Sequence, residues 1–177
     1  MPNKNKIVEL LDELSPEAQL IGAVNTVLND NGKLIGYNTD GYGFMQSVRD
    51  AGHDVTNKNI TVMGVGGASM AICAQSALDG ASSVHIFARR TSRYWNRTQK
   101  FAENLTAKTG CQVCLFDNDD HTALKDSIAQ SYLLINATSV GMVPDIDDTI
   151  IKDTSLFRPG LVVADVVYER RKPDFSG

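Results

Sequence analysis

The sequence predicts an α/β protein with a doubly wound parallel sheet, preceded by the remnant of a second α/β domain. From Asn59 onwards, short and almost continuously apolar segments alternate with segments of helical periodicity. Such apolar segments suit strands that are buried on both faces of a parallel sheet, with helices on each side. In addition, Val62 to Gly80 has the pattern of a strand, a glycine-rich turn and an apolar-faced helix. That arrangement is typical of phosphate binding.

The first 58 residues show a different pattern. The apolar spacing after Ile7 is helical, Ser15-Pro16 is typical of a helix start, and the turn at 30–33 separates two short extended segments. The elements expected here are a helix over 7–14, a second short helix from Pro16, extended segments over 23–29 and 34–38, and a helix from Asp40 to about Gly52.

The remainder alternates regularly between strands and helices. The strands expected are ITVMGV, SVHIFA, QVCLF, YLLINA and LVVADVVY, and the helices lie over 67–79, near 94–108, near 121–129 and, as a short one, near 149–156. We expect right-handed crossovers between these strands, which gives the doubly wound, Rossmann-like dinucleotide-binding pattern. The predicted domains are 1–37, the remnant, and 38–177, the nucleotide-binding domain.

Composition describes an ordinary globular chain of 177 residues with 42% hydrophobic residues, 21% charged residues and a net charge of −4. No segment approaches the roughly 20 apolar residues that span a bilayer, and polar and basic residues follow Met1. We therefore expect a cytoplasmic protein with no membrane partner. The mild acidity and the absence of a long basic run also argue against a nucleic-acid partner.

The cysteines and histidines give no metal signal. Cys111 and Cys114 have the spacing of half a zinc site, but no second cysteine pair completes it. We interpret these thiols and Cys73 as small buried or half-buried apolar groups. The three histidines lie far apart in the sequence, and we expect them in a loop, a strand and a helix start. No metal site is predicted.

The glycine-rich turn is the main candidate for cofactor binding. Gly64, Gly66 and Gly67 allow a tight turn and a close approach of the backbone to an anion, and Ala68 continues into the helix. A glycine triplet alone is weak, because most such turns only reverse the chain. The strand before it and the helix after it make the prediction considerably stronger.

The end of the second strand indicates which dinucleotide is bound. An acidic residue at this position favours NAD, but the chain continues with Arg89, Arg90 and Arg93 and two hydroxyl residues. Guanidinium groups suit the 2′-phosphate of NADP. A solvated arginine face at a helix start is the alternative, and the position after the second strand favours phosphate. NADP is thus the predicted cofactor, with NAD still possible.

Several segments together resemble the shikimate dehydrogenase family. They are MPNK, GAVNT, GYNTDGYGF, GVGGAS, ARRTSR and NATSVGM, in the order and spacing of that family. MPNK in place of a TIPHK-like form is similar to the quinate/shikimate dehydrogenase branch. The resemblance implies an NADP-dependent oxidoreductase that interconverts shikimate, or quinate, with its 3-dehydro ketone, in the shikimate pathway of aromatic amino-acid biosynthesis. Lys4 and Asp40 match the family's pair that handles the hydroxyl proton.

The resemblance also implies the binding residues. Those expected to contact the substrate are Asn25, Asp40 and Tyr168, with Thr39 a weaker candidate; those along the cofactor are Thr138, Ser139 and Met142. Read without the family, Lys4 is a solvated terminal lysine, Asn25 a strand-end residue, Asp40 a helix N-cap and Tyr168 a half-buried aromatic. For Asp40, capping and catalysis are compatible.

Departures from the family pattern predict an internal fragment of a longer enzyme. The expected SxS segment does not precede Met1, the C-terminal helix with the GxxML pattern is missing, Ala88 replaces an asparagine, and Glu169 to Phe175 replaces a YNPxxT-like turn. The alternative function is a non-catalytic NADP(H)-binding module, or a partial chain that needs a partner. A second alternative is a related NADP dehydrogenase of the methylenetetrahydrofolate type, but the NTDG segment argues against it. A homodimer and the choice between shikimate and quinate stay open.

Overall fold

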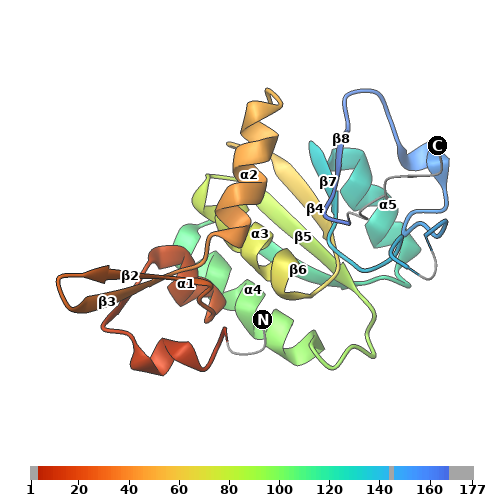
Figure 1. The fold of residues 1–177 in the computed structure, drawn as a ribbon. Coiled ribbons are helices and arrows are strands. Elements are labelled where there is room, and N and C mark those ends of the chain that lie inside the picture. The colour runs from red at the N-terminus through yellow and green to blue at the C-terminus, as the bar shows by residue number, and fades with distance from the viewer. Residues whose placement is uncertain (1–3, 144–145, 168–177) are drawn as a thin grey trace, which may run out of the picture.

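A five-stranded parallel sheet forms the centre of the computed structural model, which describes residues 4–143 and 146–167 (Figure 1). Its strand order is β6-β5-β4-β7-β8. The strands are β4 (Asn59–Met63), β5 (Ser83–Ala88), β6 (Gln112–Asp117), β7 (Leu133–Asn136) and β8 (Val162–Asp165). The chain builds outward from β4 to β6 and then returns to the other side of β4. The point between β4 and β7 is therefore the topological switch at which ligands bind in such sheets.

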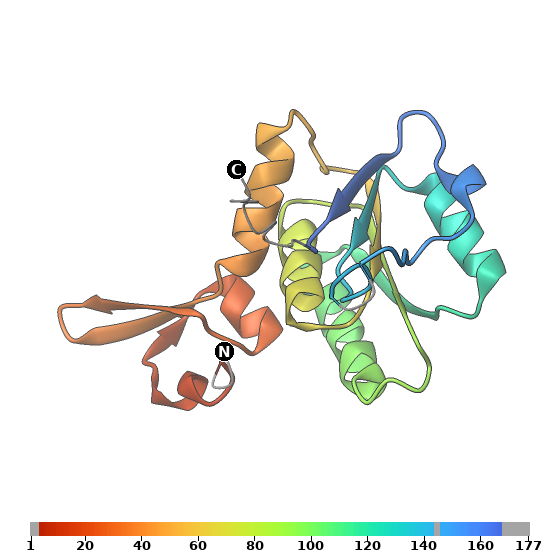
Figure 2. The same ribbon diagram turned by 45° about the vertical axis from the view of Figure 1, so that its right-hand side comes forward.

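Helices cover both faces of this sheet, as Figure 2 shows. One face carries α2 (Asp40–Asp50), α3 (Gly67–Leu78) and α4 (Trp95–Thr109), and the other carries α5 (His121–Gln130) and the 3-10 helix η2 (Thr154–Leu156). Successive strand residues point to opposite faces, so the core has two parts. Ile60 and Val62 of β4 pack in the cluster that includes α3, whereas Met63 packs in a second cluster that includes Ile128 of α5.

A second, three-stranded sheet is formed by the N-terminal part of the chain. It has the order β1-β3-β2, with β1 (Glu13–Leu14) parallel to β3 (Lys33–Tyr37), and with β2 (Thr26–Asp30) antiparallel to β3. The β2–β3 hairpin projects away from the large sheet in Figures 1 and 2. The connecting helix α1 (Pro16–Ile21) contacts α3 and α4, which joins the small sheet to the larger unit.

Most of the predicted elements are confirmed. The predicted fold class, the hairpin, the helix opened by Ser15 and the strand–helix alternation after Asn59 are all present. The Ser15 hydroxyl accepts a hydrogen bond from the Ala18 N–H at 3.4 Å, as a helix N-cap does. The described residues contain no helix that is both long and apolar enough to cross a bilayer. The domain boundary at 37/38 stays a prediction, although β3 ends at Tyr37 and α2 begins at Asp40.

Two predicted helices are wrong or shorter than expected. The segment 7–14 forms the short 3-10 helix η1 (Ile7–Leu10) and then β1, which pairs with β3. Leu11 and Leu14 pack over Gly36, where a larger residue would meet both side chains. The strand is thus stabilised by pairing with a distant segment, which local periodicity does not reveal. Near 149–156, only Thr154–Leu156 is helical.

Candidate active site

A lysine, a carboxylate and an amide from three separate segments meet in the N-terminal half. The Lys4 Nζ lies 2.6 Å from the Asp40 Oδ2, and the Asn25 Nδ2 donates a hydrogen bond to the other carboxylate oxygen at 2.8 Å. The Lys4 and Asp40 side chains are 29% and 42% exposed, so both are open to a small molecule. The structure therefore brings together the two predicted catalytic residues and one predicted substrate-binding residue.

Backbone hydrogen bonds hold this cluster in place. The Val24 N–H donates to the Lys4 carbonyl at 2.9 Å, and the Asn25 N–H donates to the Tyr37 carbonyl at 3.0 Å. The Asn25 Oδ1 accepts from the Thr39 N–H at 3.1 Å, which fixes the amide with its Nδ2 toward Asp40. Thr39, the weaker substrate candidate, thus serves to orient Asn25.

Asp40 is the first residue of α2 rather than its N-cap, which is Thr39. Its own N–H donates to the Oδ1 of the buried Asn38 at 3.3 Å. A carboxylate in the first turn of a helix is favoured by the helix dipole. Asn38 in turn donates from Nδ2 to the Ala23 carbonyl at 3.1 Å, so it joins the start of α2 to the small sheet.

The glycine-rich turn links β4 to α3 with exposed backbone. Gly64 has a φ of +107°, and a Cβ there would lie 2.8 Å from the Ala137 carbonyl oxygen, so the position requires glycine. At Gly66 and Gly67 a Cβ would meet nothing within 4 Å, and both residues are exposed. Ala68 is exposed in the first turn of α3. The backbone N–H groups that begin α3 can therefore reach an anion.

A groove of about 930 Å³ runs from this turn along the carboxyl ends of the strands. Arg89, Thr91, Ser92 and Arg93 line it. Arg90, also predicted to bind the cofactor, is not among its lining residues, because its guanidinium stacks over the Trp95 ring at 4.5 Å. Two arginines and two hydroxyl residues thus line the groove, a donor set that fits a phosphate monoester.

The loop after β7 forms the opposite wall of the groove. Thr138 and Ser139 line it, whereas Met142 is 46% exposed and lies outside the lining. Asn136 shapes this loop: its Oδ1 accepts from the Thr138 N–H at 3.1 Å, and its Nδ2 donates to Asp165 at 3.0 Å. The predicted residue Tyr168 lies outside the described residues.

Four candidate functional residues were not predicted from the sequence. Asn38 and Asn136 hold the two loops that carry site residues, and Tyr94 lines the groove. For Asn38 and Asn136, the position of an asparagine at the end of a strand could have indicated this role. The asparagine amide can hydrogen-bond the backbone groups that have no partner where strand pairing ends. Asn118, directly after β6, also lines the groove.

The thiols and imidazoles occupy the expected kinds of position. Cys73 and Cys111 are buried and Cys114 is half-buried. Burial raises the pKa of Cys73 to about 12 and that of Cys111 to about 11, so both stay protonated near neutral pH. His53 follows α2, His85 lies in β5 and His121 begins α5. No cluster of three or more potential metal-ligating side chains occurs among the described residues.

The sequence is similar to known proteins over almost its whole length. A family model described as the shikimate dehydrogenase substrate binding domain matches residues 1–27. A relative from Listeria innocua, named shikimate dehydrogenase (NADP(+)), is 48% identical over 172 residues, which cover 97% of this chain and 59% of the relative. The chain therefore spans about three fifths of the length of such relatives.

Solved structures show the same fold. A Listeria monocytogenes shikimate 5-dehydrogenase, solved in complex with shikimate and NAD, has a TM-score of 0.92 and is 47% identical, covering 95% of this chain and 58% of that one. A Corynebacterium glutamicum quinate dehydrogenase, solved with NAD, has a TM-score of 0.78 and is 30% identical, covering 94% and 57%. Identity is thus higher to the shikimate enzyme than to the quinate enzyme.

Proposed function

We propose that the chain belongs to the shikimate dehydrogenase family and carries the proton-transfer pair, Lys4 and Asp40, and the NADP(H) groove of an enzyme that interconverts shikimate and its 3-dehydro ketone. The relatives at 48–49% identity are named for NADP. Quinate is the second substrate candidate, since a quinate dehydrogenase shares the fold at 30% identity.

The contact between Lys4 and Asp40 is the observation that carries this proposal. Oxidation of a ring hydroxyl to a ketone requires the hydroxyl to lose a proton while the carbon loses a hydride. Bound NADP⁺ supplies the hydride acceptor. The hydroxyl proton passes to the Lys4–Asp40 pair, whose nitrogen and oxygen are only 2.6 Å apart. In the reverse direction, the ammonium of Lys4 polarises the ketone and returns the proton.

Asn25 supports both parts of this chemistry. Its Oδ1 is held by the Thr39 N–H, and its Nδ2 donates to the Asp40 Oδ1, so the carboxylate is oriented toward Lys4. Its amide can also donate to and accept from the hydroxyls of a polyol, as the family resemblance implies.

The cleft beside the pair brings the two halves of the reaction together. It has a volume of about 430 Å³, and its lining includes Lys4 and Asp40 of the pair together with Gly66 and Gly67 of the glycine turn. It shares Val65, Gly66 and Tyr94 with the larger groove. A dinucleotide whose phosphates lie on the glycine turn therefore has a route from the arginines toward the proton-transfer pair.

The arginines support NADP as the cofactor. Arg89 and Arg93 face the groove beyond the end of β5, where the 2′ position of the adenosine ribose is expected in this fold. The described part of that loop offers no carboxylate to the ribose hydroxyls.

The test is turnover by this chain. Purified protein is incubated with NADP⁺ and shikimate, or with quinate, and NADPH formation is followed by absorbance. NADPH formation that depends on shikimate supports the proposal, and the ratio of the two rates identifies the substrate. NADP⁺ binding without turnover of either compound favours the alternative, a binding module or a chain that needs a partner.

A further inference from the structure

Among the buried side-chain polar atoms in the described part of the chain, one has no hydrogen-bond partner, and it belongs to Asn118. The atom is Oδ1, the amide oxygen. Buried polar atoms in native proteins are almost always hydrogen-bonded, and leaving one unpaired is unfavourable. The Asn118 backbone N–H has a partner, since it donates to the Ala88 carbonyl at 2.9 Å.

Asn118 occupies a wall of the proposed cofactor groove. It follows β6 directly. The hydrogen bond from its N–H to the Ala88 carbonyl places it beside the end of β5, which Arg89 follows. Asn118 lines both the groove and an adjoining pocket of about 290 Å³. Ile150 lines the same two spaces, so an amide and an apolar side chain face this part of the groove together.

This wall matches the chemistry of an adenine ring. If the phosphates of a dinucleotide lie on the glycine turn and its 2′-phosphate lies on Arg89 and Arg93, the base continues toward Asn118 and Ile150. Adenine carries an amino donor at N6 beside a ring acceptor at N7, and an asparagine amide is complementary to that pair. The terminal side-chain torsion of asparagine takes a broad range of angles, so the amide can rotate toward the base. This rotation breaks no hydrogen bond to Oδ1, because Oδ1 has no partner.

We propose that Asn118 recognises the adenine base, with Oδ1 accepting a hydrogen bond from the N6 amino group, Nδ2 donating to N7, and Ile150 packing on the ring face. This inference rests on the proposed function, because it requires a dinucleotide in the groove. It adds a residue that selects the base, distinct from the arginines that select the 2′-phosphate.

The experiment compares NADP⁺ with nicotinamide hypoxanthine dinucleotide phosphate, in which a carbonyl oxygen replaces the N6 amino group. Dissociation constants for both are measured on the unaltered chain, on Asn118→Ala and on Asn104→Ala, an asparagine of α4 outside the groove. The unaltered chain and Asn104→Ala should bind NADP⁺ roughly tenfold more tightly than the analogue, as the loss of one well-placed hydrogen bond predicts. Asn118→Ala should bind NADP⁺ roughly tenfold more weakly and lose the preference.

The outcomes separate this inference from the proposed function. Tight NADP⁺ binding with no preference over the hypoxanthine analogue overturns the role of Asn118 and leaves the NADP site intact. No NADP⁺ binding by the unaltered chain overturns both. The comparison on the unaltered chain needs no variant, so it stands even where Asn118→Ala fails to fold, which a circular dichroism melt reveals.

Discussion

Gly41 of α2 packs directly on the backbone carbonyl of Ala71 in α3, so closely that a Cβ at Gly41 would overlap the carbonyl oxygen. The neighbour of Gly41 is Asp40 of the proton-transfer pair, and α3 begins at the glycine turn. The contact therefore fixes the distance between the Asp40 carboxylate, the proposed catalytic group, and the glycine turn proposed to bind phosphate. Because the obstructing atom belongs to the backbone of a helix, it cannot move aside cheaply.

Gly41→Ala should destabilise the chain in spite of the better helix propensity of alanine. Alanine gains about 1 kcal/mol over glycine inside a helix, whereas overpacking costs about 1–3 kcal/mol. We expect a net loss of about 1 kcal/mol in the free energy of unfolding, measured by urea denaturation. Gly43→Ala in the same helix is the matched control, since a Cβ there meets nothing within 4 Å. It should be neutral or stabilising, and equal effects of the two substitutions would contradict the packing account.

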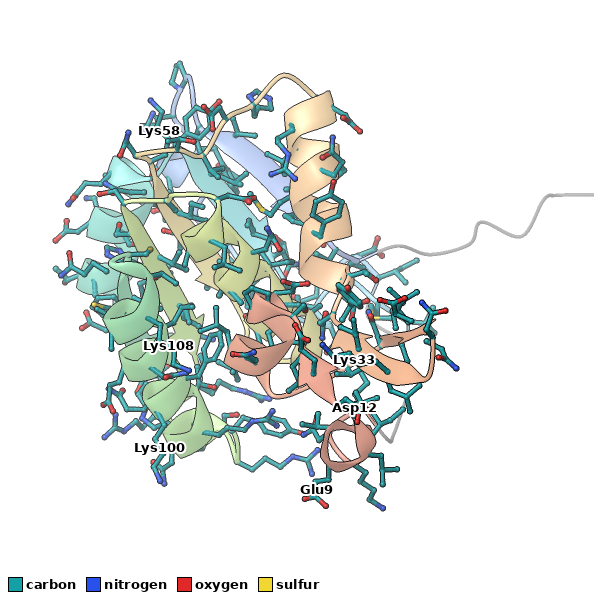
Figure 3. The ribbon with its side chains drawn as sticks, turned by 90° about the vertical axis from the view of Figure 1, so that its left-hand side faces the viewer. Glu9, Asp12, Lys33, Lys58, Lys100 and Lys108 are labelled. Carbon is teal, nitrogen blue, oxygen red and sulfur yellow. The ribbon has the colours of Figure 1, made fainter. Side chains whose placement is uncertain are left out.

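Lys4→Met and Asp40→Asn should each reduce turnover without weakening NADP⁺ binding. General acid–base catalysis contributes roughly 10²- to 10⁴-fold, so a loss of at least about 100-fold in kcat is expected. The control is Lys33→Met, at the Lys33 labelled in Figure 3, which removes a second lysine–carboxylate pair, the one that Lys33 forms with Glu13. Its turnover should match the unaltered chain. Comparable kcat for Lys4→Met and Lys33→Met would remove Lys4 from the mechanism.

We expect the three arginines to differ in their effect on NADP⁺ binding, depending on whether each one lines the groove. Arg89→Gln and Arg93→Gln should each weaken NADP⁺ binding by roughly 10- to 100-fold, as expected for charge-assisted hydrogen bonds, with little change for NAD⁺. Arg90→Gln should leave both dissociation constants within about twofold, because Arg90 stacks on Trp95 outside the groove. A large effect of Arg90→Gln on NADP⁺ alone would show that this side chain reorients toward the phosphate.

His85 should make stability depend on pH. Its Nδ1 lies 2.9 Å from the Ser127 hydroxyl, and burial lowers the pKa of the imidazole below its ordinary value of 6.5. The unfolded chain therefore binds the proton more readily than the folded chain. The stabilisation is fully present above pH 6.5 and is lost as pH falls through the lower native pKa. Urea unfolding at several pH values should show this loss, and His85→Gln should flatten it, whereas the exposed control His121→Gln should not.

Local patterns predict much of the fold because strand burial and helix periodicity are properties of neighbouring residues. They fail at β1, whose conformation depends on pairing with β3, more than 20 residues away in sequence. The family resemblance identifies Lys4, but the contact with Asp40 depends on the hydrogen bond that holds Lys4 beside Val24. Asn118 could not be recognised from its own neighbourhood, because its position beside Ala88 arises only when β6 pairs with β5. The orientation of Arg90 depends in the same way on a ring contact that spacing does not reveal.

The most direct test is the titration of this chain with NADP⁺ and, separately, with NAD⁺, followed by the fluorescence of Trp95, its single tryptophan. Trp95 begins α4 and contacts Arg90, next to the segment that lines the groove, so its emission should report occupancy. Saturable NADP⁺ binding at least about tenfold tighter than NAD⁺ binding is the predicted result, because the 2′-phosphate adds charge-assisted hydrogen bonds. If neither nucleotide binds, or if both bind equally, the account of an NADP site built on the glycine turn and the arginines is contradicted.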